Sequence, residues 1–198
     1  MKKIYLLALV AMAGFAVQAQ NADIGLKGGL NLATWSNNGS GAAYANRLGF
    51  NGGLFAQFRV TPQFAVQPEV VYSSQGTKYT IGNQEHDLKL NYVNIPVMLQ
   101  AMVGRGFYAE AGPQIGFLTG TADKVGDVET GYFTTNDFKK NDVGLGVGLG
   151  FSGASGLGIN GRYNFGLTNI NNAGTNKIKN NVLQVDLTYK FNGGGRRY

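Results

Sequence analysis

The chain has 198 residues, of which 31 are glycine and none is cysteine, and its formal net charge is +6. A chain without cysteine has no disulfides, thiolate metal sites or lipid-anchored cysteine, and so much glycine is unfavourable in a helical protein. Basic residues are scattered along the chain instead of clustered, so we expect no nucleic-acid partner.

Residues 1–19 have the pattern of a cleavable export signal. Lys2 and Lys3 precede an apolar stretch over residues 4–17, which is shorter than the ~20 apolar residues that a membrane-spanning helix needs. We therefore expect cleavage after Ala19 instead of a permanent membrane anchor.

The chain after this signal alternates apolar residues with small or polar ones, and a period of two predicts β-strands. The first expected strand covers residues 24–35, with Leu26 on its apolar face. The second and third cover residues 48–60 and 64–76. We expect a tight turn between them at Pro62, because proline has the fixed φ that a turn position requires.

The fourth expected strand, residues 88–103, alternates less cleanly. Its apolar residues after Asn91 share one face, but Leu88 and Leu90 fall on the other. A β-bulge near Asn91 would shift the phase by one residue and bring these leucines onto the common face. We therefore predict a bulge at this point, after a polar loop over residues 77–87.

The remaining expected strands cover residues 107–118, 142–151, 156–167 and 181–191. The strand over residues 142–151 has the clearest pattern, because valine, leucine and phenylalanine alternate there with glycine. The glycines lie within a strand pattern and no helix follows them, so we do not interpret them as a nucleotide-binding loop.

The connections between these strands alternate between long and short. The long ones are residues 36–47, 77–87, 119–141 and 168–180. In an up-and-down barrel this order places every long loop at one rim and every tight turn at the other, as in outer-membrane barrels. We therefore predict an all-β fold over residues 20–191, an eight-stranded antiparallel transmembrane barrel with long outer loops and short periplasmic turns, and a polar tail over residues 192–198.

The direction of the apolar face separates a membrane barrel from a soluble lipocalin-like carrier, whose apolar face lines a cavity. Aromatic residues near the strand ends of the apolar face are typical of membrane interfaces. They are Phe50, Phe58, Phe64, Tyr72, Phe107, Phe117, Tyr163, Tyr189 and Phe191. The opposite face carries glycine and charge together, which fits a narrow lumen, so we expect lipid outside. Trp35 and Tyr44 are expected to be interface anchors; the alternative is packing among the loops.

Charged residues on the polar face predict a belt of ion pairs across the lumen. The members of this lumen charge belt are Lys27, Arg59, Glu69, Glu110, Arg162 and Asp186. The same face also carries Asp142 and Lys190. The interior of an eight-stranded barrel is just wide enough for side chains to fill, and buried charges require partners. We therefore expect a plugged lumen; a gated narrow pore is the alternative.

His86 is the only histidine and stands between Glu85 and Asp87 in an expected loop. A solvated side chain is the expected state there, and metal binding by this trio is the alternative. No serine-centred motif accompanies it, so no nucleophile and base are indicated. The sequence therefore predicts no catalytic site, no metal, no cofactor and no enzymatic activity.

Five segments resemble the PorT-like outer-membrane β-barrel family of Bacteroidetes-type bacteria. They are residues 25–35, 67–76, 90–100, 106–118 and 162–170. The resemblance implies an integral outer-membrane barrel, and it associates the family's namesake with type IX secretion and gliding. Such chains commonly stop at the aromatic residue that closes the last strand, whereas this one continues from Phe191 to Tyr198.

We therefore expect a bacterial outer-membrane protein with a structural or interaction role in the cell envelope, linked through the resemblance to a secretion assembly. A narrow channel for small solutes or ions and a soluble periplasmic carrier are the alternatives. The expected partners are outer-membrane lipid, the barrel-assembly machinery with periplasmic chaperones, and an envelope or secretion protein.

Overall fold

The computed structural model describes residues 22–37, 44–172 and 177–191. The expected export signal and polar tail lie outside the described residues. Nine strands and one short 3₁₀ helix make up the described fold. They are β1 (Ala22–Asn37), β2 (Arg47–Arg59), β3 (Phe64–Ile81), β4 (Gln84–Val103), β5 (Phe107–Val125), β6 (Val128–Glu129), η2 (Thr135–Asp137), β7 (Asn141–Ser152), β8 (Leu157–Gly166) and β9 (Ile178–Lys190).

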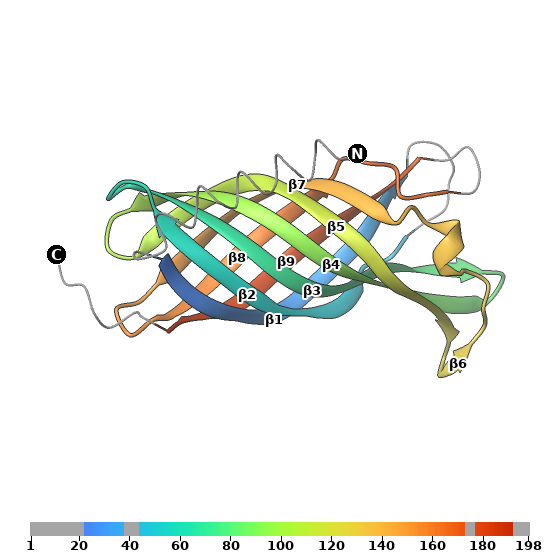
Figure 1. Ribbon diagram of the computed structural model, residues 1–198. Coiled ribbons are helices and arrows are strands. Elements are labelled where there is room, and N and C mark those ends of the chain that lie inside the picture. The colour runs from blue at the N-terminus through green and yellow to red at the C-terminus, as the bar shows by residue number, and fades with distance from the viewer. Residues whose placement is uncertain (1–21, 38–43, 173–176, 192–198) are drawn as a thin grey trace.

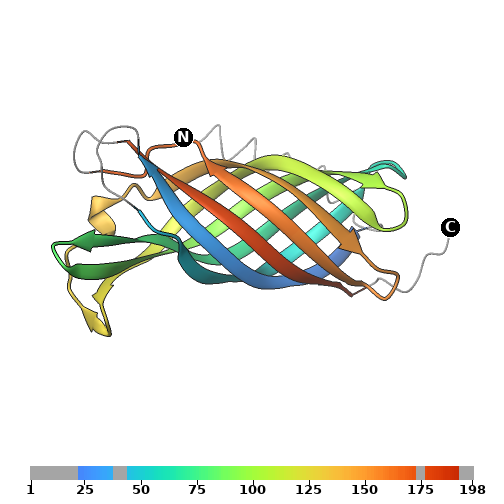
Figure 2. The same ribbon diagram turned by 180° about the vertical axis from the view of Figure 1, so that it is seen from behind.

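The long strands form one closed antiparallel ring. Each pairs with its neighbour along the chain, β5 pairs with β7 across the insertion of β6, and β1 closes the ring on β9 (Figures 1 and 2). The closing register runs from the Gly25–Lys190 pair to the Asn37–Ile178 pair. The predicted eight-stranded up-and-down barrel is therefore confirmed.

The apolar face of the ring points outward. Leu149 is 70% exposed on the outside, whereas Arg162 is 1% exposed on the inside. The outer surface carries exposed leucine, valine, isoleucine and phenylalanine from all the ring strands. A soluble carrier with an apolar cavity needs the opposite arrangement, so that alternative is wrong. Apolar surface of this extent is stable when lipid covers it.

The predicted bulge lies at the expected level but on the neighbouring strand. Asn91 pairs with Gly120 and Tyr92 pairs with Leu118, so the extra residue, Thr119, belongs to β5. Burial continues to alternate along β4 without a phase shift. Leu88 and Leu90 therefore point into the barrel, contrary to our expectation that they would join the outer apolar face.

The predicted polar loop over residues 77–87 is also wrong. β3 continues to Ile81, β4 starts at Gln84, and the turn between them uses Gly82 with a φ of 61°. This hairpin and the end of β5 extend beyond the barrel wall at the end opposite the tight turns (Figure 1). The segment resembled a loop because polar residues occupy it, and the backbone ladder between β3 and β4 holds it as strand.

The glycines of β7 line the lumen and make room for long side chains. A Cβ on Gly148 would collide with the carbonyl oxygen of Gly161 and lie 3.1 Å from Glu110 Oε1. A Cβ on Gly150 would collide with the ring of Tyr108. Gly161 on the neighbouring strand β8 differs from these glycines, because a Cβ there would meet no atom within 4 Å.

Gly148→Ala is therefore expected to destabilise the barrel by about 1–3 kcal/mol, because the added methyl group overpacks the lumen. Equilibrium unfolding in urea, with the protein folded into lipid vesicles, measures this change. Gly161→Ala is the matched control and should stay within about 0.5 kcal/mol of the parent protein. Equal effects of the two substitutions would contradict this account of the glycine pattern.

Candidate functional site

Arg162 on β8 lies at the centre of the lumen and binds two carboxylates. Its Nη1 and Nη2 donate to Glu69 on β3 at 3.0 and 2.7 Å, and its Nε donates to Glu110 on β5 at 2.7 Å. All three side chains are almost completely buried. Charge-assisted bonds of this forked kind are stronger than neutral ones and fix orientation, so Arg162 joins three separate strands.

Lys27 on β1 continues this network. Its Nζ lies 3.1 Å from Glu69 Oε2 and 2.9 Å from Asp186 Oδ2 on β9. The structure thus brings together five residues of the predicted belt. Arg59 is the exception, because it is the last residue of β2 and its side chain is exposed at the turn rim, outside this network.

Lys190 joins the belt through two glutamine side chains. Its Nζ donates to Gln57 Oε1 at 2.8 Å, Gln57 Nε2 donates to Gln100 Oε1 at 2.5 Å, and Gln100 Nε2 donates to Glu110 at 3.0 Å. Lys27, Arg162 and Lys190 thus balance Glu69, Glu110 and Asp186. The position of Lys190 on the polar face of the last strand was the sequence signal that it belongs to the belt.

Asn31 begins a neutral polar layer next to the charges. Asn51 Nδ2 donates to Asn31 Oδ1 at 2.9 Å and to Asp186 Oδ1 at 2.8 Å. Gln184 Nε2 donates to Asn31 Oδ1 at 3.1 Å, and Asn31 Nδ2 donates to Ser73 Oγ at 2.9 Å. The lumen is therefore filled by side chains that bond to one another, although the Oδ1 atoms of Asn51, Asn160 and Asn164 have no hydrogen-bond partner among the described residues.

An apolar cluster occupies the loop end of the barrel. This loop-side cluster consists of Trp35, Leu88, Leu90, Tyr92, Leu118, Phe138, Ile170 and Ile178, and Tyr44, Tyr79 and Phe133 pack against it. Trp35 contacts Tyr44 and Phe138, with ring centroids 5.4 and 5.7 Å apart. The expectation that Trp35 and Tyr44 anchor the chain at the membrane interface is therefore wrong, because Trp35 packs with the loop residue Phe138 and Tyr44 packs against Trp35. The broken alternation at Leu88 and Leu90 was the sequence signal for this cluster.

His86 is not the solvated loop residue that we expected. It lies on β4 in the extended hairpin and is 2% exposed, with its ring stacked on Tyr79 at 4.9 Å. Its Nδ1 lies 3.4 Å from Asp123 Oδ2 on β5. Tyr79 donates to the same oxygen at 2.9 Å. Burial and this carboxylate raise the pKa of Tyr79, so its hydroxyl remains a donor.

The trio around His86 does not converge on one point. Glu85 accepts from Lys78 Nζ at 2.7 Å, Asp87 accepts from Arg47 Nε at 2.5 Å, and His86 points inward. Among the residues that the structure describes, no group of three or more histidine, cysteine, aspartate or glutamate side chains is placed to hold a metal ion. The described part of the chain also contains no helix long and apolar enough to cross a membrane.

Comparison with known proteins identifies the same architecture. A family model described as outer membrane protein beta-barrel domain matches residues 18–172. The crystal structure of Neisserial surface protein A is 15% identical, with a TM-score of 0.56, and covers 86% of this chain and 99% of its own. Ail, the attachment invasion locus protein of Yersinia pestis, in complex with the heparin analogue sucrose octasulfate, is 14% identical over the same shares, with a TM-score of 0.53.

At these identities the solved structures show a common fold. No curated protein sequence matches the chain.

Arg162→Ala is expected to destabilise the barrel by about 3–5 kcal/mol, because it leaves Glu110 buried without its cation and Glu69 with Lys27 alone. Urea unfolding in lipid vesicles measures the loss, and Arg105→Ala in an exposed turn is the control for losing an arginine. Adding Glu69→Gln and Glu110→Gln to the Arg162 variant should restore part of the stability. No loss in the single variant would contradict the central role of this guanidinium.

Proposed function

The chain belongs to the outer membrane protein β-barrel domain family, and from this premise we propose that it is a closed, non-conducting barrel that binds a partner through its loop-side rim. The family and the fold place the chain in the bacterial outer membrane. One observation carries the proposal: two different layers, the charge belt and the loop-side cluster, fill the lumen in series.

Each layer opposes the passage of ions for its own reason. The belt residues satisfy one another, so a permeating ion must break bonds such as those between Arg162 and Glu69. The loop-side cluster offers an ion mostly apolar atoms in place of its hydration shell, with the hydroxyl of Tyr92 and the indole nitrogen of Trp35 as its buried, unpartnered polar atoms. An ion that passes one layer still meets the other.

The loop-side rim has features of an interaction surface. The β3–β4 hairpin and the β5–β6 segment project past the wall (Figure 1). Large apolar side chains are exposed near their tips at Ile81 and Val128, and Tyr132 on the segment after β6 has 67% of its surface exposed although its ring contacts His86. These positions lie beyond the lipid-covered wall, so exposed apolar atoms there favour contact with another molecule.

The narrower placement among PorT-like barrels remains part of this proposal, as does a partner from a secretion assembly. The five resembling segments support it. Cleavage of the export signal, delivery by periplasmic chaperones and insertion by the barrel-assembly machinery are proposed on the pattern of residues 1–19 and on the barrel fold.

The channel alternative predicts conductance and the closed barrel predicts silence. We expect planar-bilayer recordings of the folded protein to show no conductance steps, with a large porin added afterwards as the positive control. Because two layers close the lumen, Arg162→Ala should also stay silent. Steady conductance of the unmodified protein would overturn the closed barrel.

The partner is sought by photo-crosslinking in intact outer membranes. A p-benzoylphenylalanine side chain in place of Tyr132 is expected to capture a protein that the same probe at Gln63, in an exposed turn at the other rim, does not capture. Mass spectrometry of the adduct then identifies the partner, and a type IX secretion component would support the PorT-like placement. Adducts from the Gln63 probe alone would contradict a loop-side interaction.

A further inference from the structure

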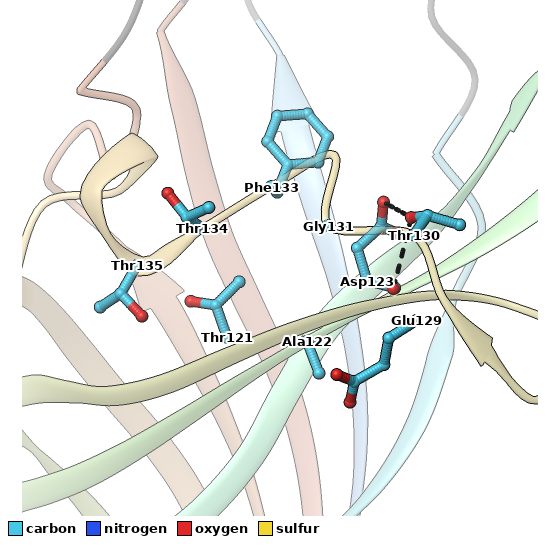
Figure 3. Close-up of a pocket in the computed structure, with 9 residues that line it drawn as sticks. All are labelled: Thr121, Ala122, Asp123, Glu129, Thr130, Gly131, Phe133, Thr134 and Thr135. Carbon is cyan, nitrogen blue, oxygen red and sulfur yellow. Dashed lines mark hydrogen bonds between the residues drawn. The ribbon is translucent and has the colours of Figure 1, made fainter.

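A polar pocket of about 460 Å³ lies between the end of β5 and the segment that follows β6. Figure 3 shows Thr121 and Asp123 on β5, with Phe133, Thr134 and Thr135 on the segment that passes over them. The pocket is separate from the lumen charge belt. Its volume lies within the usual range for small-molecule sites.

Two oxygens beneath this pocket lack hydrogen-bond partners. Asp123 is 2% exposed, and its Oδ2 accepts from Tyr79 and from Thr130 Oγ1, each at 2.9 Å. Its Oδ1 and the hydroxyl of Thr121 are buried with no partner among the described residues. Buried oxygens of this kind are costly, and a donor supplied by a ligand removes the cost.

The lining selects the chemistry of the ligand. Threonine hydroxyls both donate and accept, Asp123 and Glu129 accept, and Phe133 offers an apolar face. None of the described lining residues is lysine or arginine, which disfavours sulfated or phosphorylated ligands. His86 already stands beside Asp123, so this carboxylate has a polar neighbour without a ligand cation. Many hydroxyl groups next to an apolar face are the chemistry of an uncharged sugar.

We propose that this pocket binds a neutral saccharide, whose hydroxyl groups donate to Asp123 Oδ1 and Thr121 Oγ1. The inference rests on the proposed function only because the proposed function places the loop-side rim, and with it the pocket, outside the cell. Both oxygens are covered in this structure, so binding requires the covering segment to move outward. Gly131 and Thr134 on that segment are exposed. The movement must release Phe133 from the loop-side cluster and Thr130 from Asp123, so a ligand has to compensate for these contacts.

The binding test uses the folded barrel in phosphatidylcholine nanodiscs, because glycoside detergents are themselves sugars. Calorimetric titration with glucose, galactose, mannose, N-acetylglucosamine and sucrose is expected to show saturable binding of at least one. Sucrose octasulfate, a charged derivative of sucrose, should not bind. Absence of binding by every neutral sugar, or binding of the octasulfate alone, would overturn the proposal. Displacement of a bound sugar by calcium chloride or butylammonium chloride would overturn it in favour of a cation site.

Thr121→Val carries the decisive comparison, since Asp123→Asn also alters bonds to Tyr79 and Thr130. The Thr121→Val substitution keeps the shape of the side chain and removes an unpartnered hydroxyl. We expect sugar binding to weaken about fivefold, with no fall in the unfolding temperature. Thr80→Val, on the exposed part of β3, is the matched control and should bind like the parent. Unchanged binding by the Thr121 variant would sink the proposal.

A second arm separates possible sources of the sugar. Retention of the barrel on beads that carry dextran or mannan assigns the ligand to a polymer, whereas binding of free sugars alone assigns it to small saccharides. The conductance and crosslinking experiments use neither probe. A failed sugar titration therefore leaves the closed barrel and its loop-side partner untouched, and the reverse also holds.

Discussion

The bonds from Arg162 to Glu69 and Glu110 are the constraint on which the rest of the barrel depends. They place three ionised groups in a space that water does not fill, where an unpaired charge is severely destabilising. The planar fork of arginine binds both oxygens of Glu69 and also Glu110 in fixed directions, and a lysine ammonium lacks that planar geometry. Strands β3, β5 and β8 must therefore hold fixed positions around one guanidinium.

This constraint also explains the unequal use of side chains on the two faces. The wall needs large apolar groups outside, whereas the lumen has room for few large groups. The inner glycines of β7 give up their own volume to Arg162, Glu110 and Tyr108. The same strand presents Val147 and Leu149 to the outside. The inner glycines of this strand thus leave the space that the long charged side chains of the belt occupy.

Much of this fold could be predicted from the sequence, because strand alternation is a local signal that needs no partner. The belt followed from charges on the polar face, and Lys27, Glu69 and Arg162 meet there. Pairing in space was harder to predict. The sequence placed Leu88 on the outer face because it cannot show that an extra residue belongs to the neighbouring strand.

Distance along the chain and contact with the loops explain why the observed positions of the other residues differ from the predicted ones. His86 has polar neighbours along the chain that suggest a loop, and it is buried by the β3–β4 ladder, by β5 and by Tyr132 from the segment after β6. Trp35 meets Phe138, a residue about a hundred positions away. Arg59 has the correct parity for the lumen, but it stands at the last residue of its strand, where the wall ends.

The long sequence separations within the belt have a consequence for assembly. Arg162 and Glu69 are 93 positions apart, and Asn51 and Asp186 are 135 apart, so these bonds form only when the two ends of the chain meet. Contacts of such high order form late in folding. A partly inserted sheet therefore exposes uncompensated charge towards the bilayer. Lys27–Glu69 and Arg162–Glu110 join strands that are close along the chain, whereas the pairing of Lys27 with Asp186 coincides with ring closure.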